Sequence, residues 1–172
     1  IKARTRAVQR EIFFGGYWQD PAKFFTNLAA DVDAWPTVWE EIAIPPDVLA
    51  SSRAKKNACV AGASLAKRFG WQVGQHITLQ GSPWGVDPEL EIVGFYTCHD
   101  KRHEEILAFR WDYLDDLLGN PGLVSCFWLK ANGPDDVPVL KEIIDGHTRN
   151  SANPTETMTE KEFGRVAFDL RP

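Results

Sequence analysis

The fold is decided by two neighbouring stretches, ACVAGASLAKRFGWQVGQHITLQG at residues 58–81 and LEIVGFY at residues 90–96. In the first stretch, Ser64 is placed to cap a short helix. Leu65 and Phe69 are four residues apart and therefore share one face of that helix. Gly70 can end it by adopting the left-handed conformation. The sequence thus predicts an apolar strand followed by a helix of about two turns.

Two further strands are expected after this helix. Ile77 and Leu79 point to one side and the polar residues between them to the other, which is the period of a half-buried strand. Residues 90–96 are predicted to form its return strand. Within that strand the apolar residues change parity after Ile92, and Gly94 is a natural place for a bulge. The organising unit is therefore a strand, a short helix and a pair of strands.

The rest of the chain contains shorter predicted elements. The expected strands are 7–17, 23–30, 106–111 and 124–130, and the expected helices are 33–41, 45–56, 112–118, 135–147 and 159–170. Segment 23–30 also fits a helical turn. Segment 124–130 carries apolar side chains on both faces, which predicts a strand that is covered on both sides and central in its sheet.

A capping box marks the start of the last helix. Thr159 and Glu162 have the spacing at which each side chain caps the other residue's backbone N–H group. Phe163 and Val166 then begin an apolar face that Leu170 continues. We expect this face to pack on the domain.

The stretch from residue 61 to residue 81, together with EIVGFY, resembles the extracytoplasmic domain of MacB-like and FtsX-like ABC transporter permeases. Three other segments are similar to parts of that family and occur in the family's order: FGGYWQDP at 14–21, FRWDYL at 109–114 and PTETMTEKEF at 154–163. The resemblance therefore extends over most of the chain.

The resemblance implies a single extracytoplasmic domain, residues 1–172, with an α+β fold in two lobes. Residues 1–45 with 123–172 would form the membrane-proximal lobe, and residues 46–122 the inserted lobe. The order of predicted strands and helices suggests a mixed sheet with helices packed on one face. In the family, such a domain is non-catalytic, lies on the periplasmic face of the bacterial inner membrane and passes ATP-driven movement of membrane helices to a substrate or partner.

The partners that this implies are the permease's own transmembrane helices, into which the last helix would lead, a cytoplasmic ATPase subunit and a second copy of the permease. Composition agrees with a soluble piece of such a protein. Of the 172 residues, 44% are hydrophobic, which is enough for a sizeable core. The net charge of −5 argues against nucleic-acid binding. No stretch approaches the ~18 apolar residues of a spanning helix, which favours an excised domain.

Few residues suggest chemistry. His99 and His103 are ligand types that zinc accepts, but this i,i+4 pair binds a metal only if the segment is helical, and a solvated loop fits as well. We therefore expect no catalytic residues, no cofactor and no metal site. Cys59, Cys98 and Cys126 lie in apolar, strand-like contexts and are predicted to be buried free thiols.

Three aromatic residues are candidates for contact with a partner or substrate: Tyr17, Trp18 and Trp84. Trp84 lies at the expected tip of a hairpin, where burial is hard to arrange. Tyr17 and Trp18 follow a Gly-Gly turn, and a role as core and loop anchor is the alternative for them. Two other functions stay open, a secreted lipid- or peptide-binding module and a metal-dependent secreted enzyme that uses the His99 and His103 region.

Overall fold

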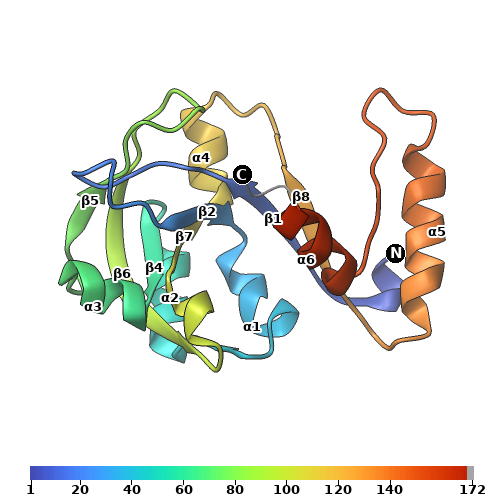
Figure 1. The fold of residues 1–172 in the computed structure, drawn as a ribbon, viewed down its shortest axis with the longest axis horizontal. Coiled ribbons are helices and arrows are strands. Elements are labelled where there is room, and N and C mark those ends of the chain that lie inside the picture. Colours follow the sequence, from blue (N-terminus) through green and yellow to red (C-terminus); the bar gives the residue numbers. More distant parts are fainter. Residues whose placement is uncertain (170–172) are drawn as a thin grey trace. The chain divides into compact units, whose positions relative to one another are not determined.

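The computed structural model describes residues 1–169, with side chains to residue 165 (Figure 1). Its strands are β1 (Thr5–Phe13), β2 (Thr26–Ala30), β3 (Ile42–Ala43), β4 (Ala58–Gly62), β5 (His76–Thr78), β6 (Glu89–Cys98), β7 (Ile106–Arg110) and β8 (Cys126–Ala131). Its α-helices are α1 (Trp35–Val38), α2 (Pro46–Ala54), α3 (Ala63–Phe69), α4 (Trp111–Leu117), α5 (Asp136–Thr148) and α6 (Glu160–Asp169). Short 3-10 helices are η1 (Lys2–Arg4), η2 (Val32–Ala34) and η3 (Lys101–Glu104).

The chain divides into two compact units. Unit 1 is formed by Ile1–Ala7 and Leu129–Pro172, and unit 2 by Val8–Trp128. Within unit 1, the backbone N–H of Asn132 donates to the carbonyl of Arg4 (2.9 Å), which ties the N-terminal segment to the residues that follow β8. The predicted lobes, 1–45 with 123–172 and 46–122, follow a different division and stay a prediction.

One mixed sheet orders the strands β3-β6-β4-β7-β2-β1-β8, and β5 pairs with β6 beside this path. β4 is parallel to β6 and antiparallel to β7, β7 is parallel to β2, and β2 is antiparallel to β1. The prediction of an α+β fold with a mixed sheet is confirmed.

The central position predicted for residues 124–130 is wrong. These residues contribute to β8, which ends the strand order, and the side chain of Phe127 is 53% exposed. The strand buried on both faces is β4, all five residues of which are buried. Apolar residues at both odd and even positions of a strand predict that both of its faces are buried. The same pattern occurs in an end strand whose aromatic side chains stay at the surface, so it does not identify an inner strand.

Helices cover both faces of the central strands, whereas the sequence suggested one face. Side chains alternate along a strand, so β4 sends Cys59 to one face and Val60 to the other. Helices α3 and α4 cover the first face with the fully buried Leu65 and Leu114. Helices α1 and α2 cover the second face, where Val48 of α2 packs. The sheet therefore has two separate core layers.

The bulge expected near Gly94 is confirmed. The register of β4 against β6 shifts between Cys59 and Val60, which oppose Ile92 and Gly94, so that Val93 is the extra residue. A Cβ atom on Gly94 would lie 2.3 Å from a methyl carbon of Val48. Glycine at this position lets α2 approach the sheet.

Helix α3 ends as predicted but begins differently. Gly70 has a φ of +68° and caps its C-terminus. Ser64, however, does not cap the N-terminus: its hydroxyl donates to Oε2 of Glu104 (2.7 Å), and Gly62 occupies the N-cap position. A buried carboxylate is a strong acceptor, and its position 40 residues away cannot be read from local sequence.

The helix predicted over residues 33–41 is limited to η2 and the four-residue α1. None of the helices in the described part of the chain has the length and apolar run that a membrane crossing needs.

Candidate functional site

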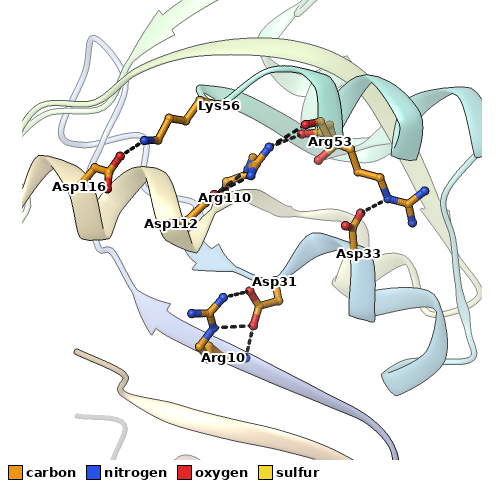
Figure 2. A network of polar contacts seen from close by, with 9 residues as sticks. Arg10, Asp31, Asp33, Arg53, Lys56, Arg110, Asp112 and Asp116 are labelled. Atoms are coloured by element: carbon orange, nitrogen blue, oxygen red, sulfur yellow. Dashed lines mark hydrogen bonds and ion pairs between the residues drawn. The ribbon is translucent and has the colours of Figure 1, made fainter. Parts of the chain in front are cut away.

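A network of charged side chains surrounds a pocket of unit 2 (Figure 2). Arg10 of β1 binds Asp31 through two hydrogen bonds, Nε to Oδ2 (2.9 Å) and Nη2 to Oδ1 (2.7 Å), and its backbone N–H also donates to Oδ2. The guanidinium lies over the ring of Trp111, 3.7 Å from the centroid. The hydrogen bond to Asp31 raises the pKa of Arg10. Arg10 is therefore held from two sides.

Arg110 forms a second ion pair and also binds the C-terminal end of a helix. Its Nε and Nη2 donate to the carboxylate of Asp112 (2.9 and 2.5 Å). Its Nη1 donates to the carbonyls of Ser52 and Arg53 in the last turn of α2 (3.3 and 2.9 Å). These carbonyls lack partners within the helix, so the guanidinium satisfies them. The hydrogen bond from Arg110 lowers the pKa of Asp112.

The charges of the network balance. Each basic side chain pairs with one aspartate: Arg10 with Asp31, Arg53 with Asp33, Lys56 with Asp116, and Arg110 with Asp112. All of these pairs except Lys56–Asp116 line the pocket, which has a volume of about 190 Å³. An anionic ligand would have to displace an existing ion pair there. We therefore interpret the network as a structural joint between β1, β7, α2 and α4 rather than as a binding site.

The loops that carry Tyr17 and Trp84 lie side by side. Tyr17 and Gln80 exchange two backbone hydrogen bonds of 2.9 Å, and Nε1 of Trp84 donates to the carbonyl of Phe13 (3.1 Å). Both candidate side chains are half-buried. The aromatic rings therefore anchor these loops and keep part of their surface exposed, and their contact role stays a prediction.

Trp18 packs into an aromatic cluster. Its ring lies edge to face against Phe69 and Trp71, with centroids 5.7 and 5.5 Å apart. Trp18 is half-buried, so it too serves as an anchor and leaves an edge exposed. Phe25 also belongs to this cluster, and Phe24, which precedes it in the sequence, is 54% exposed. This part of unit 2 therefore presents aromatic surface beyond the three predicted residues.

The capping box at the start of α6 is formed. The N–H of Glu162 donates to Oγ1 of Thr159 (3.2 Å), and the N–H of Thr159 donates to Oε2 of Glu162 (2.6 Å). The latter bond is the main cause that lowers the pKa of Glu162 to about 2. Lys141 of α5 also binds Glu162 (3.2 Å). Phe163 is 40% exposed, and the side chain of Val166 lies outside the described residues.

One buried carboxylate, that of Glu104, has no signal in the sequence. Glu104 lies in the polar run after β6 and is only 1% exposed. It accepts hydrogen bonds from the hydroxyl of Ser64 (2.7 Å), the N–H of Cys98 (2.8 Å) and Nζ of Lys101 (2.6 Å). Burial raises the pKa of Glu104, but these three hydrogen bonds together outweigh it and bring the pKa to about 2. A run of charged residues is typical of an exposed loop and carries no sign of such a partner.

The same run takes part in a group of possible metal ligands. One ligand atom each of Glu41, Cys98 and His103 lie within 4.8 Å of one another. His99, considered with His103 in the sequence, is not in this group of described residues. It precedes η3, so the helical spacing that would pair the two histidines is not realised.

No protein-family model matches this chain, and neither does any curated protein sequence. Three solved structures are similar to it. The periplasmic region of MacB from Actinobacillus actinomycetemcomitans has a TM-score of 0.62 at 6% identity, over 99% of this chain and 78% of that one. The extracellular domain of the noncanonic ABC-type transporter YknZ from Gram-positive bacteria has a TM-score of 0.63 at 10% identity, over 90% and 82%.

The third is a domain of a protein described as a permease, from Porphyromonas gingivalis, with a TM-score of 0.55 at 14% identity over 96% of this chain and 83% of that one. At such identities the likeness shows the fold. The chain has the fold of MacB-like periplasmic domains, as the resemblance in sequence predicted.

Proposed function

From this shared fold, we propose that the chain is the non-catalytic extracytoplasmic domain of an ABC transporter permease, on the periplasmic face of a bacterial inner membrane. The observation that carries the proposal is the match, over at least 90% of the chain, to a periplasmic and an extracellular transporter domain and to a domain of a protein described as a permease. The sequence motifs at residues 14–21, 61–81, 109–114 and 154–163 support the same family. The partners would be the permease's transmembrane helices, a cytoplasmic ATPase subunit and a second permease copy.

The build of unit 1 supports a mechanical role. Both ends of the chain belong to this unit, and Arg4 binds Asp136 of α5 across 132 residues of sequence (2.5 Å). Glu162 of α6 binds Lys141 of α5. Movement of membrane helices attached at either end would therefore reach the same compact unit. We assign the coupling to α6, through Thr159, Glu162, Phe163 and Val166.

The aromatic surface of unit 2 is our candidate for contact with a substrate or partner. Tyr17, Trp18 and Trp84 would provide anchors, because half-buried aromatic rings offer contact area at low cost in side-chain entropy. The exposed Phe13, whose carbonyl binds Trp84, extends this surface.

Location can be tested by cysteine labelling. In the full-length protein, with any cysteine outside residues 1–172 replaced by serine, Cys126→Ser removes the half-buried thiol, whereas Cys59 and Cys98 are buried. Asn150→Cys then adds a reactive thiol at an exposed turn. A maleimide that cannot cross the inner membrane should label this variant in intact spheroplasts and leave the Cys126→Ser parent unlabelled. Labelling that requires lysis would place the domain in the cytoplasm and overturn the proposal.

Coupling can be tested in the purified transporter. Phe163→Ser should reduce transport per ATP hydrolysed, because it weakens the packing of α6. Lys161→Ala is the matched control, since Lys161 is exposed and one turn or less away. Equal transport efficiency in both variants would argue against a coupling role for α6.

A further inference from the structure

Three side chains with metal-binding atoms converge at one edge of the sheet in unit 2. Glu41 directly precedes β3, Cys98 ends β6, and His103 lies in η3. Ile42 of β3 opposes Cys98 in the antiparallel pair, which brings the residue before Ile42 toward η3. From the convergence of a thiol, an imidazole and a carboxylate within 4.8 Å, we propose that Glu41, Cys98 and His103 bind a divalent cation of the zinc class. This proposal is independent of the transport function and departs from the absence of metal expected from the sequence.

The donor set selects the metal. A thiolate and an imidazole are preferred ligands of Zn²⁺ and of its analogues Co²⁺ and Cd²⁺, and the carboxylate oxygen completes a mixed set that zinc accepts. Mg²⁺ and Ca²⁺ take oxygen ligands and have little affinity for a thiolate. The group therefore predicts zinc over the hard cations.

The spacing requires only a small closure. Ligand atoms around a tetrahedral zinc ion, with bonds of about 2.3 Å to sulfur and 2.0–2.1 Å to nitrogen, lie ~3.6 Å apart. Nδ1 of His103 and Oε1 of Glu41 are 3.9 Å apart, and the widest separation in the group is below 4.8 Å. Glu41 and His103 have side-chain exposures of 38% and 46%, so both are free of tight packing and can rotate inward.

The backbone beneath the ligands is fixed. The N–H of Cys98 donates to the buried Glu104, and the hydroxyl of Tyr96 donates to the carbonyl of His103 (2.7 Å). The N–H of His99 donates to the carbonyl of Glu41 (3.4 Å), which links the two strands beside the site. The three ligands therefore start from defined positions, and binding needs no change of the fold.

The site would be open on one side. Cys98 is 4% exposed and forms its floor, whereas Glu41 and His103 form its rim. Three protein ligands leave the fourth tetrahedral position to water, as in open zinc sites. We therefore expect one bound ion with an exchangeable ligand.

Cobalt titration of the 172-residue protein, purified without metal under reducing conditions, tests the proposal. Cys98 as a ligand predicts a thiolate-to-cobalt charge-transfer band in the near ultraviolet that saturates at one equivalent and disappears when Zn²⁺ is added. Cys98→Ser should abolish the band, and Cys126→Ser should leave it unchanged. No charge-transfer band in the wild-type protein would overturn the proposal.

The histidine variants make the test independent of folding effects at the buried cysteine. His103→Gln removes an exposed ligand and should weaken Zn²⁺ binding, measured by calorimetry, by more than the ~10–100-fold typical of groups that only orient ligands. His99→Gln is the matched control, because His99 is also exposed and lies outside the group. It should bind zinc like the wild type. Equal loss in both histidine variants would indicate unspecific surface binding and refute the site.

Discussion

Replacement of Gly62 by alanine should strongly destabilise unit 2. The backbone of Gly62 has a φ of −63° and a ψ of 144°, which any residue adopts, so the substitution causes no strain in the backbone itself. The space is the problem: an added Cβ would lie 2.0 Å from the carbonyl oxygen of Glu104 and 2.6 Å from its Cα. Real Cβ atoms stay beyond 3.0 Å of such neighbours, so η3 has to move by about an ångström.

The displacement should disturb the buried carboxylate as well. Glu104 is bound by Ser64, Cys98 and Lys101, and a shift of η3 lengthens these hydrogen bonds together. Overpacking alone costs ~1–3 kcal/mol. Complete loss of one hydrogen bond to a charged group adds a further cost of ~1.5–3 kcal/mol, and its weakening adds less. Because the structure relaxes in part, we expect the free energy of unfolding to fall by about 3 kcal/mol in total. For a domain of this size, this loss corresponds to a fall in Tm of roughly 6–12 °C.

Urea unfolding, followed by tryptophan fluorescence, measures this loss. Gly70→Ala is a useful comparison, since Gly70 has a φ of +68° and nothing within 4 Å of an added Cβ. The free energy of unfolding of that variant should fall only by the ~1–2 kcal/mol that alanine costs in the left-handed backbone conformation. Gly62→Ala should therefore be the more destabilised of the two, although its backbone conformation is the more ordinary.

A double-mutant cycle identifies the cause. If Gly62→Ala acts by displacing Glu104, its cost should be smaller in a Glu104→Gln background, in which the hydrogen bonds are already weaker. A change in the free energy of unfolding of less than ~0.5 kcal/mol on Gly62→Ala, the usual effect of a surface substitution, would show that Glu104 is not displaced.

Three other predictions concern titration, reactivity and the last helix. Burial raises the pKa of Glu11 in the folded protein above the ordinary glutamate value of ~4.3, so the folded state binds the Glu11 proton more tightly than the unfolded state does. The stability that this tighter proton binding contributes is complete below pH ~4.3 and is lost as the pH rises through the folded-state pKa. Glu11→Gln should therefore reduce the fall in stability between acidic and neutral pH, measured by urea melts; an unchanged pH profile would contradict this. Burial raises the pKa of Cys126 to about 12, so at pH 8 its thiol should react with a disulfide reagent far more slowly than free cysteine, and Cys59 should react only after unfolding. Phe163→Ala should cost more than the ~1 kcal/mol of Thr159→Ala, but less than the ~3–5 kcal/mol of a fully buried phenylalanine, because Phe163 is 40% exposed; equal, negligible costs in denaturant melts would show that α6 is not docked.

Local features were predictable because their physical causes are local. Gly70 ends α3 because a left-handed residue is needed there, and the capping box of Thr159 and Glu162 depends on atoms three residues apart. The bulge near Gly94 follows from a change of parity within one strand. Each of these features can be derived from a short window of sequence.

Features that depend on distant partners were not predictable in the same way. Ser64 suits an N-cap, but the carboxylate that it binds lies 40 residues away in a run that resembles an exposed loop. Glu41 ends a predicted helix and His103 lies in a predicted loop, and only the pairing of β3 with β6 brings them to Cys98. The end position of β8 depends likewise on which strands pair, which the apolar pattern of a single strand does not specify.

The strand order also has a consequence for synthesis of the protein on the ribosome. In that order, β7 separates β3, β6 and β4 from β2, β1 and β8. The chain emerges from its N-terminus, so β2 and β4 are available long before Ile106–Arg110 can pair with both. Until then, the apolar faces of two incomplete sheets face the solvent, a condition that favours aggregation or chaperone binding. The nascent domain can thus close its core only after residue 110 has emerged from the ribosome.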